Sequence, residues 1–204
     1  SSLVIFGITL SGSKLNLITN YFNIYLKKSE WFALSSMTMI LNSIFFKSGS
    51  LATSTYLKKK HNFPYASFVG SFIGDQLIIL FIASLIGSIS SIFLIHSEKV
   101  QLFFTIITFS IITAFLFVLL SGKITLPKKE SGIWQQLSIV TESFNTLLQN
   151  KKLLRALCLH NLLLIITVGL RLFTACSILN QEISITHCFL FVATMAIIRV
   201  IPIA

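Results

Sequence analysis

The stretch LFFTIITFSIITAFLFVLL, residues 102–120, decides the fold class. It carries no charged residue, and about 20 apolar residues suffice for a helix to cross the hydrocarbon layer of a bilayer. The whole chain has the same character, with 54% hydrophobic residues, only 11% charged residues and a mean hydropathy of +0.87. This composition excludes an ordinary soluble domain and predicts an all-α fold, a polytopic transmembrane helical bundle.

Further apolar runs surround this stretch, at residues 3–10, 66–95, 156–179 and 185 to the end. The run 66–95 is longer as a helix than the ~30 Å hydrocarbon layer, so we expect it to tilt, or to break at residues 87–91. The chain opens without methionine and stops inside an apolar run. We therefore expect a single membrane domain, residues 1–204, truncated at both ends, with residues 3–10 as the end of a cut span.

Residues 31–46 form a shorter apolar segment with lysines on both flanks, too short for the ~20 residues of a full crossing. If the segment dips in and returns, thirteen of the fourteen basic residues expected in loops share one face and Lys99 opposes them. If it crosses, Lys14, Lys27 and Lys28 change sides and the split becomes 10:4. Because short cytoplasmic loops accumulate Lys and Arg, we favour a re-entrant element, which requires a polar cavity; the crossing remains open.

Two segments outside the spans have the periodicity of amphipathic helices. The first carries Leu15, Ile18, Phe22 and Leu26 at helical spacing, which predicts a helix at the membrane interface. The second lies in a basic cytoplasmic connector, residues 122–155, which begins with Lys123, Lys128 and Lys129. We expect its helix to lie on the membrane surface or against the bundle, with a solvated linker as the alternative. Its apolar face comprises Ile133, Leu137, Val140, Phe144 and Leu147.

Three charged residues lie inside predicted spans: Asp75, Arg171 and Arg199. A carboxylate in an apolar run costs about 2.5 to 3.5 kcal/mol, so Asp75 should face the bundle. Arg199 is expected at a comparable depth, which allows a structural ion pair with Asp75 while Arg171 extends outward. In the other interpretation the two arginines line a polar path and bind an anionic headgroup, because a guanidinium fits phosphate. Both interpretations remain open.

The segment NSIFFKSGSLATSTYLKKK, residues 42–60, is a polar island in this apolar chain. Its candidate substrate-binding residues are Asn42, Lys47, Gly49 and Ser50, which offer hydrogen bonds, a charge and close backbone approach. Asp75, Arg171 and Arg199 of the predicted spans belong to the same candidate set. The cluster Lys58, Lys59 and Lys60 either attracts lipid phosphate at the cytoplasmic surface or only enforces the orientation of the chain.

Several classes of site find no support in the sequence. The three cysteines show no paired spacing, and the four histidines are interfacial or, for His160, packed within a span. No nucleophile, base and acid arrangement and no phosphate-binding glycine loop is visible, so we predict no catalytic residue, no metal, no cofactor and no enzyme. The net charge of +10 lies in short loops, which indicates anionic membrane lipids rather than nucleic acid as partners; no protein partner is indicated.

Asn42, Lys47 and Gly49, followed by YLKKKHNFPY at residues 56–65 and by a span with Asp75, resemble the first conserved region of a flippase-like family. That family includes the membrane portion of the lysylphosphatidylglycerol synthases. Its pattern is Asn, Pro, Arg, Gly-Glu, a basic cluster and then a helix with an acid. The resemblance implies movement of a lipid or lipid-linked headgroup between leaflets of the cell membrane.

The later run from Arg171 to Arg199 and Pro202 resembles the second half of the same family. The chain departs from the first pattern where Phe45, Lys47 and Ser50 stand in place of Pro, Arg and Glu. Lys47 keeps the charge but loses the bidentate geometry. Two other functions remain open. One is a non-transporting assembly or regulatory partner of an envelope lipid or glycan system, and the other is an ion-coupled solute transporter with Asp75 as the coupling acid.

Overall fold

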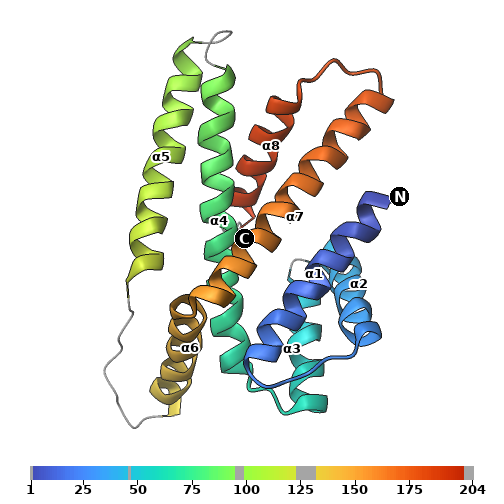
Figure 1. Cartoon of the computed structure of the whole chain (residues 1–204), viewed down its shortest axis with the longest axis vertical. Coiled ribbons are helices and arrows are strands. Elements are labelled where there is room, and N and C mark those ends of the chain that lie inside the picture. Colours follow the sequence, from blue (N-terminus) through green and yellow to red (C-terminus); the bar gives the residue numbers. More distant parts are fainter. Residues whose placement is uncertain (1, 46, 95–98, 123–131, 200–204) are drawn as a thin grey trace. The chain divides into compact units, whose positions relative to one another are not determined.

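The computed structural model describes residues 2–45, 47–94, 99–122 and 132–199. Within these ranges the protein forms eight α-helices and no strand, which confirms the all-α prediction. Phe46, His96, Lys123, Lys128, Lys129 and Pro202 lie outside the described residues. The helices are α1 (Ser2–Tyr21), α2 (Lys28–Ile44), α3 (Ser48–His61), α4 (Tyr65–Leu94), α5 (Lys99–Ser121), α6 (Gly132–Gln149), α7 (Lys151–Ile178) and α8 (Ile185–Ile198) (Figure 1).

Three of the described helices, α1, α4 and α7, are long and apolar enough to cross a membrane. The stretch at residues 102–120 falls in α5, which together with α8 adds two further apolar helices. Many large apolar side chains of these helices are exposed, among them Ile111, Phe115 and Val118 of α5. Such exposure is expected where a helix faces lipid.

Two sequence predictions about helix continuity are wrong. Residues 15–26 do not form a separate interfacial helix, because α1 continues to Tyr21 and residues 22–27 form a loop. Lys14 therefore lies inside a helix, not in a loop, which alters the charge count above. Helix α4 does not break at residues 87–91. There the hydroxyl of Ser91 donates to the carbonyl of Gly87 four residues earlier and stays within the helix (2.8 Å).

The helices form two compact units. The first contains α1, α2, α3, α6 and the initial parts of α4 and α7. Helix α4 passes into the second unit after Asp75, and α7 does so after His160. The second unit contains these remaining parts together with α5 and α8.

In the first unit an apolar cluster fills the space where α1 ends, α2 begins and α3 ends. Its buried members are Leu26, Leu34, Leu57 and Phe63. We call this end of the unit the basic end, because it carries Lys27, Lys28, Lys58, Lys59 and Lys60. Elsewhere in the unit α6 packs closely on α4: a Cβ at Gly70 would collide with the carbonyl of Val140. The connector helix thus lies against the bundle.

In the second unit a hydrogen bond between hydroxyl groups joins α4 to α5, from Thr113 Oγ1 to Ser84 Oγ (2.8 Å). Gly87 lies three residues after Ser84 on α4, and because it has no side chain the ring of Phe109 can pack against the helix there. Phe81 and Phe117 also pack, with ring centroids 6.4 Å apart. Small residues and a short polar contact therefore bring these two apolar helices together, as is common in membrane bundles.

Candidate functional site

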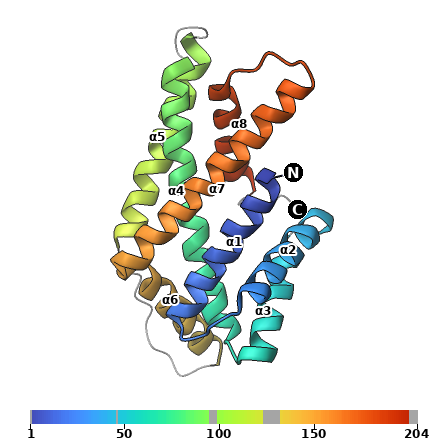
Figure 2. The same cartoon turned by 45° about the vertical axis from the view of Figure 1, so that its right-hand side comes forward.

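Helices α2 and α3 form an antiparallel hairpin within the first unit (Figure 2). Their 17 and 14 residues correspond to roughly 25 Å and 21 Å, both shorter than the ~30 Å hydrocarbon layer. The chain reverses between the end of α2 at Ile44 and the start of α3 at Ser48, where Lys47 adopts a left-handed conformation with φ 58°. The reversal thus lies at the end of the predicted segment 31–46, and Lys47 lies at the turn, away from Lys58–Lys60. Ile44 and Phe45 at the turn are exposed.

Polar groups hold the hairpin together along its seam. The Oδ1 of Asn42 accepts from the backbone N–H of Gly49 (2.9 Å), and the hydroxyl groups of Thr38 and Thr53 are 2.7 Å apart. A Cβ at Gly49 would collide with the backbone of Thr38, so glycine is required for this approach. Asn42 and Gly49, predicted to bind substrate, therefore hold the turn closed.

Glu30 organises the base of the hairpin, at the basic end. Its Oε1 accepts from the hydroxyl of Tyr56 (2.8 Å), from His61 Nε2 (2.7 Å) and from Lys60 Nζ (3.2 Å). Burial raises the pKa of Glu30, but the hydrogen bonds from His61, Tyr56 and Lys60 outweigh it and lower the pKa from 4.5 to about 2. Hydrogen bonds with Tyr56 and Glu30 raise the pKa of Lys60. Glu30 and Lys60 are therefore both ionised at neutral pH.

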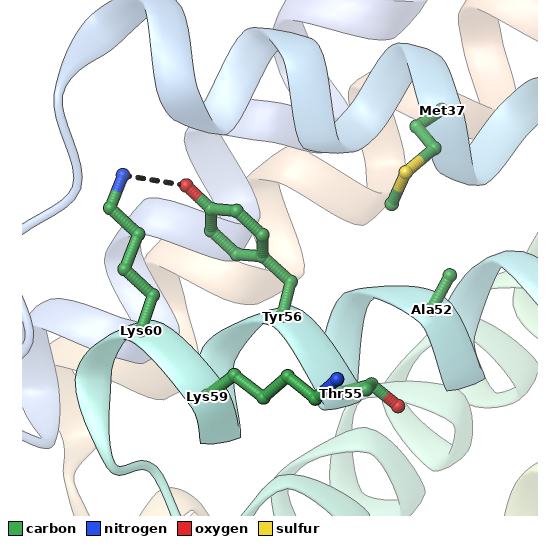
Figure 3. A pocket seen from close by; sticks show the side chains of 6 residues that line it. All are labelled: Met37, Ala52, Thr55, Tyr56, Lys59 and Lys60. Atoms are coloured by element: carbon green, nitrogen blue, oxygen red, sulfur yellow. Dashed lines mark hydrogen bonds between the residues drawn. The ribbon is translucent and has the colours of Figure 1, made fainter.

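A groove of about 680 Å³ runs along α3 and is bounded on one side by α2 (Figure 3). Met37 lines the groove from α2. Tyr56 and Lys60 line it from α3, and Lys60 Nζ donates to the hydroxyl of Tyr56 (2.7 Å). The remaining lining residues are Ala52, Thr55 and Lys59. Met37 and Ala52 thus lie at one end of the groove and the ammonium of Lys60 at the other, while the side chain of Lys59 extends along α3 toward Thr55 (Figure 3). This combination suits an amphiphile with a negative headgroup.

A second polar feature lies inside the first unit, away from the basic end. Lys14 Nζ of α1 donates to Asp75 Oδ2 of α4 at 2.7 Å, with side chains only 13% and 6% exposed. The prediction that Asp75 faces protein is confirmed. Its ion-pair partner is Lys14, whereas the sequence had suggested Arg199. The adjacent Ser13 Oγ lies 3.2 Å from Nε2 of His160 on α7.

The two predicted arginines belong to the second unit, where both side chains are exposed: Arg171 on α7 and Arg199 after α8. A groove of about 610 Å³ lies in this unit between α7 and α8, and neither arginine lines it. Its walls include Cys176, Glu182, His187 and Phe191. The charged groups of these arginines therefore remain at the surface of their unit.

The predicted site residues do not form one cluster. Asn42, Lys47, Gly49 and Ser50 gather at the turn of the hairpin, whereas Lys58–Lys60 lie at the far end of α3, about 15 Å away at helical rise. Sequence reasoning missed Lys14, Glu30, Tyr56 and the Ser13–His160 contact. One signal was available for Tyr56 and Lys60, since residues four apart share a helix face.

The function of this protein is inferred from the contacts within its own chain. No family model, no curated protein and no solved structure matches the chain. Among the described residues no group of three or more His, Cys, Asp or Glu side chains could hold a metal ion. The arrangement supports ionic and hydrogen-bond recognition by lysines and hydroxyl groups in an apolar setting.

Proposed function

We propose that this protein is a multi-pass protein of the cell membrane that binds an anionic lipid or lipid-linked headgroup and moves it between leaflets. The single observation that supports this best is the groove on the α2–α3 hairpin. It joins an apolar floor, Met37 and Ala52, to the ammonium groups of Lys59 and Lys60. Phospholipids have the same arrangement of an apolar body and a charged head.

The length of the hairpin supports a role in crossing the membrane. The groove covers residues 52–60 of α3, about 12 Å of helix, and points from the basic end toward the turn. Irregular and polar backbone is tolerated at membrane depth only where protein or water covers it. In this proposal the hairpin is a re-entrant element whose polar seam forms one wall of a headgroup path.

The test uses the full chain reconstituted in vesicles that contain a fluorescent anionic phospholipid, with a membrane-impermeant quencher reporting the fraction in the outer leaflet. Wild-type protein should make nearly all of the labelled lipid accessible over time. Lys59→Gln should weaken headgroup binding about fivefold, which corresponds to the ~1 kcal/mol of one lysine at a lipid surface. Ala52→Leu should also slow exchange, because the added side chain fills the apolar end of the groove.

Lys151→Gln is the matched control, since Lys151 is an exposed lysine of the same unit at the start of α7, outside the groove. It should retain the wild-type rate. If wild-type vesicles exchange no more lipid than empty vesicles, the translocator proposal fails and a non-transporting membrane partner becomes the better description. If Lys59→Gln and Lys151→Gln behave alike, the groove is not the headgroup site.

A further inference from the structure

The Lys14–Asp75 pair is a costly contact to bury between helices of a membrane bundle. Each desolvated charge costs several kcal/mol, and pairing offsets only part of this cost. Helices of this chain are joined elsewhere without charge, as by the Ser84–Thr113 hydrogen bond. What distinguishes the pair is that a carboxylate can take up and release a proton.

A second proton acceptor lies next to the pair. Nδ1 of His160 lies 2.8 Å from the carbonyl oxygen of Ala156. Because a carbonyl only accepts, Nδ1 carries the hydrogen, and in a neutral ring Nε2 then accepts from the hydroxyl of Ser13. Consecutive residues of α1, Ser13 and Lys14, thus contact His160 on α7 and Asp75 on α4.

Helix α7 brings a further titratable group near Asp75. The thiol of Cys158 on α7 lies within electrostatic reach of the Asp75 carboxylate. From α6, the side chains beside Gly74 are the apolar Phe144 and Leu147. Asp75 is therefore faced by Lys14 and is near Cys158, while the preceding Gly74 packs on apolar side chains of α6. His160 contacts Ser13, the residue before Lys14.

A polar stripe leads from this cluster toward the basic end. Asn16 and Asn20 follow Ser13 on one face of α1, at spacings of three and four residues. Their Oδ1 atoms are buried and accept no hydrogen bond from the described part of the chain. Buried acceptors normally have a donor, so these oxygens are suited to hold water. The stripe connects the level of Lys14 to the end of α1, about 10 Å away at helical rise.

We infer that Lys14 and Asp75 form a proton-exchange site, reached along the stripe, that couples proton movement to the lipid movement proposed above; the inference rests on that proposed function. When a proton binds, the Asp75 carboxylate becomes a carboxylic acid and its ion pair with Lys14 is broken. The Lys14 ammonium then attracts the anionic phosphate of the lipid. When the proton leaves, the Asp75 carboxylate forms again and pairs with Lys14, which displaces the phosphate from the ammonium group. One proton and one negative charge therefore move together.

The test imposes a pH difference across the vesicles described above and measures the ratio of labelled lipid in the two leaflets. With one proton per lipid, a difference of about one pH unit should shift this ratio by up to about tenfold, since tenfold in concentration corresponds to ~1.4 kcal/mol. Asp75→Asn should bring the shift back to none, whereas Asp75→Glu, which keeps the acid, should retain it. Ser84→Ala is the control for a buried polar contact without a titratable group, and it should retain the shift.

The outcomes separate the inference from the proposed function. If wild-type protein exchanges lipid at the same rate and to the same ratio with and without the pH difference, the inference is overturned and the translocator proposal stands. Absence of lipid movement under every condition overturns both. Should Asp75→Asn fail to fold, the double variant Lys14→Met with Asp75→Asn removes both charges. A gradient-driven shift in that variant would overturn the assignment to this pair.

Discussion

At the scale of single residues, Glu30 determines how the base of the hairpin responds to acid. Its pKa of about 2 lies below the ordinary value of 4.5, so the ionised form is the one that the folded protein favours. A depressed pKa stabilises the fold fully above pH 4.5, and this contribution is lost as the pH falls from about 4.5 to about 2. The Glu30 carboxylate thus stays ionised, and able to pair with Lys60, at every ordinary pH.

We therefore expect Glu30→Gln to lower the stability of the protein at pH 7 by on the order of 1 kcal/mol, a value typical of ion pairs with solvent access. The difference from wild type should shrink between pH 4.5 and pH 2. Thermal unfolding in detergent across this range measures both effects. Glu142→Gln, which alters an exposed acid of α6, is the control. A difference that does not depend on pH would contradict the assigned network.

Lys47 is the exception among the four residues with positive φ in the described part of the chain. The other three are asparagines, Asn23, Asn62 and Asn180, which end α1, α3 and α7 in the left-handed conformation. Asparagine tolerates this conformation, whereas a lysine there costs roughly 1 kcal/mol or more. Strain kept at a turn is often associated with function.

Lys47→Asn should therefore raise the stability of the protein by about 1 kcal/mol, because it removes this backbone strain. The reverse change at the end of α3, Asn62→Lys, should lower it by a similar amount. Unfolding temperatures of the two variants, compared with wild type, provide the measurement. Equal or lower stability of Lys47→Asn would mean that contacts of the Lys47 side chain outweigh the strain.

The single charged residues also show how far sequence can predict the site. Asp75 could be recognised, because one acid in an apolar run has to face protein. Its contact with Lys14 could not, since Lys14 is followed by a polar segment, and that segment appeared to end the span. Only the continuous helix over residues 2–21 places Lys14 opposite Asp75.

At the scale of elements, the hairpin depends on the close approach of α2 and α3 at Gly49. A Cβ there meets backbone atoms of Thr38, which cannot rotate away. We expect Gly49→Ala to destabilise the hairpin by about 1–3 kcal/mol, the range for overpacked sites. Gly132→Ala is the matched control, because nothing lies within 4 Å of a Cβ at that position. Thermal unfolding should separate the two variants, and equal stabilities would refute the tight crossing.

Sequence reasoning located the short apolar segment before the turn but not its partner helix. Residues 48–61 are too polar to be recognised as membrane-embedded, since their hydroxyl groups appear hydrophilic in any hydropathy window. In the structure the hydroxyl of Thr53 pairs with that of Thr38, and the hydroxyl of Ser48 donates to the carbonyl of Leu41. The backbone N–H of Gly49 donates to Asn42 Oδ1 in the same seam. Pairing between elements is a tertiary property, and hydropathy along one segment does not contain it.

At the scale of the molecule, the hairpin makes a prediction about sidedness. Because α2 and α3 run antiparallel, we expect their outer ends at Lys28 and Asn62 to lie on the same side of the membrane. In a variant in which Cys158, Cys176 and Cys188 are replaced by Ser, a cysteine introduced at either position should react with an impermeant thiol reagent from one and the same side. Labelling from opposite sides would show that residues 31–46 cross without returning. A cysteine at Lys151 tests whether the connector shares that side.

Composition alone predicted a helical membrane protein, because apolar runs of this length and hydropathy are rare in soluble proteins. The division into two units did not follow from it. Helices α4 and α7 each contribute to both units, and no shift in composition marks Asp75 or His160 as the place of transition.

The polar seam of the hairpin also has a consequence for biogenesis. Neither α2 nor α3 would enter lipid alone without exposing Asn42 or the facing threonines, and each unpaired group in hydrocarbon costs several kcal/mol. We therefore expect both helices to stay at the membrane interface until the ribosome has synthesised the chain as far as His61, the last residue of α3. The two helices would then insert together as a preformed pair, with hydroxyl groups already matched. Membrane entry of residues 28–61 is in this respect a single concerted event of synthesis and assembly.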